Sequence, residues 1–158
     1  MNKKLLTVIA FISLAFGALA SAYADDESRA CNDRLIAGSY GFTIEGEKLV
    51  GPPFTGAQVG VAMAHFDGKG NFHQIDSVTI GGHQVSDFTH TPANGTYKVN
   101  PDCTGSFTII FTDGRPTVTA DFVVVENGAE IDTVVTSAGG AQGVLATRSI
   151  GKRRSWWE

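Results

Sequence analysis

The stretch AQVGVAMAHFDGKGNFHQIDSVTI, residues 57–80, indicates how the rest of the chain is organised. Its first half alternates with the two-residue period of a β-strand, which puts Val59, Val61 and Met63 on one face and Gly60, Ala62 and Ala64 on the other. The turn Asp67-Gly68-Lys69-Gly70-Asn71 follows, and it is rich in residues that tolerate positive φ. Residues 72–80 resume the strand pattern, so the stretch predicts an antiparallel hairpin.

Short alternating segments between glycine-rich turns continue on both sides of this hairpin. The expected strands are residues 39–45, 57–66, 72–80, 95–100, 106–112, 117–126, 130–137 and 143–150, with a weaker candidate at 85–90. The connections leave no room for crossover helices, so the chain is an all-β antiparallel up-and-down meander of 8–9 strands. Closing the meander into a barrel removes its exposed edges, and a two-sheet β-sandwich is the alternative.

The composition is that of one folded domain. The chain has 158 residues, of which 42% are hydrophobic and 18% charged, and this excludes a wholly disordered protein. The 12 basic and 16 acidic residues give a formal net charge of −4, which argues against a general nucleic-acid binder.

Residues 1–24 have the three parts of a secretory signal peptide. Lys3 and Lys4 precede the uncharged apolar run Leu5–Phe16, and Ala22-Tyr23-Ala24 forms a small-residue cleavage site. We therefore expect an exported protein of the periplasm or the extracellular medium. The expected divisions are a signal peptide (1–24), an N-terminal segment (25–37), a β-barrel domain (38–151) and a basic, tryptophan-containing tail (152–158).

The chain has two cysteines, Cys31 and Cys103, and an oxidising compartment favours their pairing. The bridge would tether the N-terminal segment to the middle of the chain and contribute roughly 4 kcal/mol in the loop-entropy model. A reactive or metal-binding thiol pair is the alternative, although the Cys-x-x-Cys spacing is absent.

Two further segments carry a resemblance to a known family. The segments are Phe66-Asp67-Gly68-Lys69-Gly70-Asn71 and Gly95-Thr96-Tyr97-Lys98-Val99-Asn100-Pro101-Asp102-Cys103-Thr104-Gly105. They resemble the spaced F-D-G-x-G-N and G-T-Y-x-V-N-x-D-C-T-G motifs of a family of small exported bacterial β-barrel proteins. The arrangement also resembles allene oxide cyclase and lipocalin-like barrels, in fold only. The resemblance implies a barrel and no activity, because a fold does not supply a function.

An eight-stranded barrel is either filled by its side chains or has room for one small ligand. The small residues on one face of 57–66 favour the second case, so the first hypothesis is a protein that binds a small apolar or amphipathic ligand without turnover. No cofactor is expected. The candidate ligand-binding residues are Tyr40, Phe42, Met63, Phe107, Phe111 and Phe122.

A second hypothesis is an enzyme of cyclase or isomerase type. It requires a carboxylate inside the barrel, beside a histidine or tyrosine, as general acid or base. The candidates are Asp76, on the face of Val78, and Asp121, on the face of Val123. The alternative is that both carboxylates point outward and keep their strands soluble.

Four histidines fall within residues 65–90, and two of them are candidate metal ligands. A four-residue turn at 67–70 would put His65 and His73 on opposite faces of the hairpin. A five-residue turn would instead set them directly opposite each other, and His83 or His90 would have to complete a metal site. The alternative is four ordinary surface histidines.

The last residues form the basis of a third hypothesis, an envelope or surface interaction protein with a filled core. The candidate contact residues for a membrane surface or a protein partner are Lys152, Arg153, Arg154, Trp156 and Trp157. A frayed terminus is the alternative.

Overall fold

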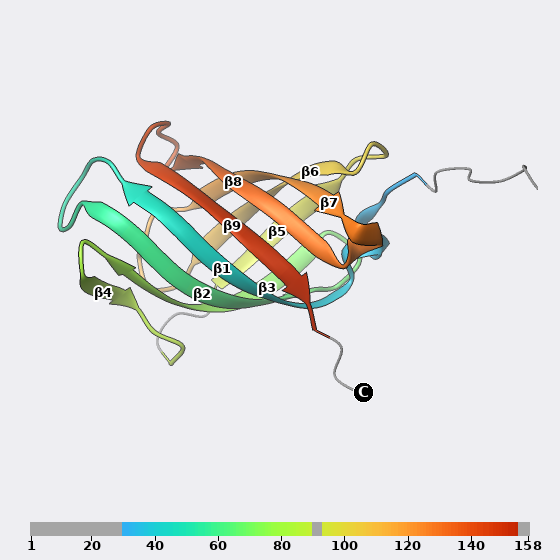
Figure 1. The fold of residues 1–158 in the computed structure, drawn as a ribbon, viewed down its shortest axis with the longest axis horizontal. Helices are drawn as coiled ribbons and strands as arrows, with labels where there is room; N and C mark the ends of the chain where they lie inside the picture. The colour runs from blue at the N-terminus through green and yellow to red at the C-terminus, as the bar shows by residue number, and fades with distance from the viewer. Residues whose placement is uncertain (1–29, 90–92, 155–158) are drawn as a thin grey trace, which may run out of the picture.

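The computed structural model describes residues 30–89 and 93–154. Its strands are β1 (Gly38–Lys48), β2 (Gly56–Phe66), β3 (Asn71–Ile80), β4 (His83–Ser86), β5 (Ala93–Val99), β6 (Thr104–Phe111), β7 (Val118–Val125), β8 (Glu130–Ala138) and β9 (Leu145–Arg153). Two short 3-10 helices, η1 (Asp33–Ile36) and η2 (Glu126–Gly128), lie at the same end of the molecule (Figure 1).

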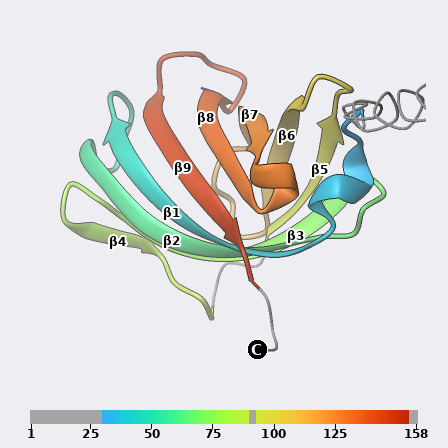
Figure 2. The same cartoon turned by 45° about the vertical axis from the view of Figure 1, so that its right-hand side comes forward.

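The strands form one antiparallel sheet that closes on itself. The hydrogen-bonded order is β2-β1-β9-β8-β7-β6-β5-β3-β4, and the additional pairing of β2 with β3 completes a ring of eight strands. β4 pairs only with the end of β3 and lies outside the ring (Figure 2). The predicted barrel is therefore confirmed, and the sandwich alternative is wrong because no second sheet exists in the described chain.

The predicted strands are present with small shifts in their ends. β1 and β9 are longer than predicted, and they pair with each other from Tyr40–Arg153 to Lys48–Leu145. This pairing places Lys152 and Arg153 in the barrel wall, whereas we expected them in the tail. The weaker candidate strand at 85–90 corresponds to β4, which covers 83–86 instead. The expected signal peptide and the two tail tryptophans lie outside the described residues.

Three phenylalanines point into the barrel, each against the glycine directly opposite on the neighbouring strand. The pairs are Phe42–Gly151, Phe72–Gly95 and Phe122–Gly105. A Cβ atom added at any of these glycines would overlap the ring of its partner. Each ring thus covers a stretch of bare backbone, which is a recurrent way of packing glycine inside a sheet.

One end of the barrel is closed by η1. Ile36 is fully buried there, and the carboxylate of Asp33 accepts hydrogen bonds from the backbone N–H of Val99 (2.7 Å) and from Lys98 Nζ (3.1 Å). The Tyr97 hydroxyl donates to the Asp33 carbonyl at 3.0 Å. Burial raises the pKa of the Tyr97 phenol.

The disulfide lies at this closed end. Cys31 and Cys103 are bonded as predicted, with Cα atoms 5.0 Å apart and 72 positions apart in the sequence. The bond ties the segment that contains η1 to the β5–β6 turn. A second attachment of η1 comes from Arg153, whose guanidinium donates to the Leu35 carbonyl and also to the hydroxyl of the buried Tyr40. Burial raises the pKa of Tyr40, and Arg153 acts in the opposite direction.

Among residues 30–89 and 93–154, no helix is long and apolar enough to span a membrane.

Candidate ligand-binding cavity

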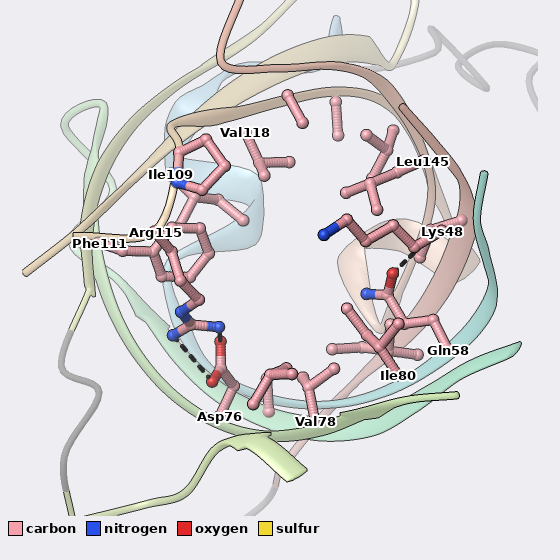
Figure 3. Close-up of a pocket in the computed structure, with 18 of the residues that line it drawn as sticks. Lys48, Gln58, Asp76, Val78, Ile80, Ile109, Phe111, Arg115, Val118 and Leu145 are labelled. Atoms are coloured by element: carbon pink, nitrogen blue, oxygen red, sulfur yellow. Dashed lines mark hydrogen bonds and ion pairs between the residues drawn. The ribbon is translucent and has the colours of Figure 1, made fainter. Parts of the chain in front are cut away.

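The end of the barrel opposite η1 is hollow. A cavity of about 670 Å³ extends inward from the loops at this end, and it is shown in Figure 3. Its inner part is lined by four phenylalanine rings and three alanines, Phe42, Phe66, Phe72, Phe107, Ala62, Ala64 and Ala120. The volume falls in the range of about 300–1,000 Å³ that is usual for sites that bind small molecules.

The small residues of β2 explain why the interior is not filled. The alternation put Gly60, Ala62 and Ala64 on one face of this strand, and that face points inward, while Val59 and Val61 face solvent. Ala62 and Ala64 lie directly opposite Asp76 and Gln74 of β3. Larger side chains on β2 would occupy the space that now forms the cavity.

One wall of the cavity carries a buried ion pair. Both carboxylate oxygens of Asp76 accept from Arg115, with Nη1–Oδ2 at 3.3 Å and Nη2–Oδ1 at 3.2 Å. Arg115 Nε donates to Asp113 at 2.7 Å, and the guanidinium stacks 3.8 Å from the centre of the Phe111 ring. Gln74 adds a longer hydrogen bond to Asp76, at 3.4 Å. Asp76 is only 2% exposed.

This ion pair spans a discontinuity in the sheet. β3 pairs with β5 only from Asn71 to Gln74, and its last residues pair with β4 instead. Arg115 comes from the loop between β6 and β7 and reaches Asp76 across this part of the wall (Figure 3). The side chains therefore connect two parts of the barrel that the backbone ladder does not join.

The opposite wall carries uncharged polar groups and one lysine. Thr147 donates to Gln58 Oε1 at 3.2 Å, and Lys48 Nζ donates to the Pro52 carbonyl at 3.0 Å. The terminal nitrogens of Lys48 and Gln58 both point toward the middle of the cavity in Figure 3. The cavity is thus apolar at its inner end and polar on two facing sides nearer the rim.

Comparison with known proteins adds no assignment to this geometry. No family model, curated protein or solved structure matches this chain. The resemblance to the family of small exported proteins stays a prediction, whereas the barrel that it implied is present.

The structure separates the six candidate ligand-binding residues into three groups. Phe42, Phe107 and Phe111 line the cavity. Tyr40 and Phe122 are buried in the barrel but are not part of the cavity lining. Met63 faces outward, opposite Gly41 and Ile75, because it lies one residue out of phase with the inward alanines of β2.

The two candidate carboxylates point in opposite directions. Asp76 lines the cavity, whereas Asp121 is exposed on the outer surface of β7. The enzyme hypothesis also requires a histidine or tyrosine near the carboxylate. Within the described chain, no histidine or tyrosine lines the cavity, and Asp76 contacts Arg115 and Gln74 there.

The histidine pair lies on the outside of the barrel. The turn has the five-residue form, so His65 is directly opposite His73, and the ring centres are 5.3 Å apart. His65 Nδ1 forms a hydrogen bond with Ser39 Oγ at 3.0 Å. His83 stacks on Phe54 at the other end of the barrel, and His90 lies outside the described residues. The part of the chain that the structure describes contains no group of three ligands suited to a metal ion.

The cavity residues that were not predicted as site residues include Lys48, Gln58 and Arg115. Gln58 already lies in the predicted strand 57–66, on the face of Gly60 and Ala62, whereas Lys48 lies two alternation steps beyond Ile44, past the predicted strand end at residue 45. Arg115 lies in a turn, and its sequence neighbours carry no signal that its side chain returns to β3.

Proposed function

We propose that this protein binds one small apolar or amphipathic molecule inside the barrel and releases it unchanged. The observation that carries the proposal is the hollow, phenylalanine-lined interior, which is closed at one end and accessible at the other. Each methylene group removed from water contributes about 0.8 kcal/mol, so an apolar ligand gains affinity in proportion to the length that enters the cavity.

The construction of the closed end supports this proposal. The disulfide, η1 and the hydrogen bonds of Asp33 hold the end opposite the cavity without any ligand. A preformed cavity loses little conformational entropy when it binds its ligand, and this favours affinity. The disulfide is also compatible with an exported location, which would place the ligand in the periplasm or the medium.

The other two hypotheses have less support. A filled-core interaction protein has no need for a cavity of about 670 Å³, and Trp156 and Trp157 of its expected contact segment lie outside the described residues. An enzyme based on Asp76 would have to use a carboxylate whose two oxygens already accept from Arg115.

The test is native mass spectrometry of the oxidised protein, purified from its own host under mild conditions. We expect a reproducible extra mass that denaturation releases, and its value identifies the class of ligand. The variant Ala62→Phe, which places a ring in the cavity, should lose the extra mass. Val61→Phe is the matched control, because Val61 is the neighbouring residue and is 45% exposed on the outer face.

Two results together would contradict the proposal. The protein would carry no extra mass, and the fluorescent probe N-phenyl-1-naphthylamine would show no enhancement in its presence. Equal loss of ligand in the two variants would contradict the location of the site. Circular dichroism of both variants establishes that they are folded, and Val78→Trp is a second cavity-filling variant if Ala62→Phe does not fold.

A further inference from the structure

The polar groups of the cavity point to the chemistry of the ligand. We propose that the ligand is an amphiphile with a single anionic acceptor group, such as a carboxylate, held at the rim by Lys48 and Gln58. This inference rests on the proposed binding function and specifies which end of the ligand lies where.

The positive charge of Arg115 is already compensated within the protein. Its Nε donates to Asp113, and Nη1 and Nη2 donate to the two oxygens of Asp76. One face of the guanidinium is covered by the Phe111 ring. Three of the five guanidinium N–H groups are thus used, and two carboxylates more than balance its charge, so this wall offers a ligand no uncompensated positive charge.

Lys48 and Gln58 have N–H groups that no described residue uses as hydrogen-bond donors. Lys48 Nζ has three N–H groups, and its one hydrogen bond in the described structure goes to the Pro52 carbonyl. Gln58 uses its oxygen to accept from Thr147, and its Nε2 group has no acceptor among the described residues. Lys48 also has no carboxylate partner there, unlike Lys98 and Lys152, which pair with Asp33 and Glu130.

The side chains of Lys48 and Gln58 point toward the same part of the cavity. Gly46 of β1 lies directly opposite Gln58 of β2, and Lys48 is two residues further along the same face. Residues in this diagonal relation are close enough for long side chains to meet. Gly46 has no side chain between them, and Figure 3 shows both nitrogens pointing into the cavity.

A pair of donors, one of them cationic, selects an acceptor. An anionic oxygen forms charge-assisted hydrogen bonds that are roughly twice as strong as neutral ones, whereas an ammonium group would be repelled by Lys48. Phe42 lies six residues before Lys48 on β1, or about 20 Å along an extended strand. A ligand with its charge on Lys48 thus extends its apolar part toward the phenylalanine-lined inner end.

The experiment compares three probes that share a twelve-carbon chain and differ in the head group. Dodecanoate, dodecan-1-ol and dodecylammonium are each titrated, below their aggregation concentrations, against the oxidised protein loaded with N-phenyl-1-naphthylamine at pH 7. We expect dodecanoate to displace this neutral probe at the lowest concentration and dodecylammonium at the highest.

Variants then assign the preference to its residues. Lys48→Met should weaken dodecanoate about tenfold, the effect of losing one hydrogen bond to a charged group, and should leave dodecan-1-ol unchanged. Lys48→Arg should keep the preference, and Gln58→Leu should weaken dodecanoate by a smaller factor. Lys69→Met is the matched control, because it removes the same charge from the exposed β2–β3 turn, outside the cavity lining.

The two proposals fail in different ways. Absence of any fluorescence enhancement by N-phenyl-1-naphthylamine contradicts ligand binding itself. Enhancement with equal displacement by the three probes, or with a preference that survives in Lys48→Met, overturns the head-group assignment and leaves the binding function intact. An equal loss in Lys69→Met and Lys48→Met would also overturn it, since the effect would then be one of net charge.

Discussion

The ion pair between Asp76 and Arg115 makes the strongest prediction about the barrel wall. Asp76→Asn removes the charge with almost no change in shape, and it leaves the Arg115 guanidinium facing an amide. Breaking a fully buried pair in this way costs about 3–5 kcal/mol. Arg115 is 21% exposed and keeps its contact with Asp113, so we expect a smaller loss of stability, about 2 kcal/mol.

The assay is urea denaturation followed by far-UV circular dichroism, with the free energy of unfolding obtained by linear extrapolation. The double variant Asp76→Leu/Arg115→Met should be less destabilised than the sum of its single variants, because it leaves no stranded charge. Arg148→Met serves as the matched control. It breaks the ion pair between Arg148 and Glu45, whose side chains are 71% and 62% exposed respectively. The free energy of unfolding should fall by less than about 1 kcal/mol.

Equal, small losses in Asp76→Asn and Arg148→Met would refute this reasoning. They would mean that the ion pair does not hold the β6–β7 loop against β3. Additive losses in the double variant would refute it in a second way, because they would show that the two side chains act independently.

Three further results are expected. Replacing Cys31 and Cys103 by serine should lower the free energy of unfolding by about 4 kcal/mol, measured by denaturation of the oxidised protein and the variant. Hydrogen bonds across the β2–β3 turn lower the pKa of Asp67 from 3.8 to about 2. This carboxylate therefore stabilises the fold above pH 3.8 and loses its effect as the pH falls toward 2. The difference in the free energy of unfolding between the protein and Asp67→Asn should shrink over the same pH range. Gly151→Ala should destabilise the barrel by about 1–3 kcal/mol in the same denaturation assay, because the added methyl group overlaps the ring of Phe42.

Much of the fold follows from local patterns in the sequence. The two-residue alternation of residues 57–66 correctly separates Ala62, which is buried, from Val61, which is exposed. It did not decide which face points inward, and Met63, predicted to bind the ligand, lies on the outer face. The same phase argument correctly keeps Asp76 on the face of Val78 and Asp121 on the face of Val123. Such predictions succeed because a strand has only two faces, and the turn residues at its ends limit where it begins and stops.

Register is harder to predict, because one residue in a turn changes every pairing that follows. The alternatives for residues 67–71 differed by a single position, and the hydrogen bond from the Asp67 N–H to the Asn71 carbonyl belongs to the longer turn. That pairing sets His65 opposite His73. Phe66 and Phe72 are both buried and directly opposite each other in this register, whereas the shorter turn would put Phe72 on the outer face. The burial of Phe72 therefore favours the longer turn.

The amino-acid sequence therefore specifies the strands, the alternation of their two faces, the disulfide and the antiparallel pairing of consecutive strands, since each depends on neighbours along the chain or on a single possible pairing. Closure of the barrel depends on the pairing of β1 with β9, from opposite ends of the described chain. The cavity, the contact of Arg115 with Asp76 and the convergence of Lys48 with Gln58 emerge only once the barrel has formed. Arg115 and Asp76 are 39 positions apart, and their meeting depends on the curvature of the whole sheet. Whether a barrel is hollow likewise depends on the sum of side-chain volumes from strands that are distant in sequence, which no local pattern contains.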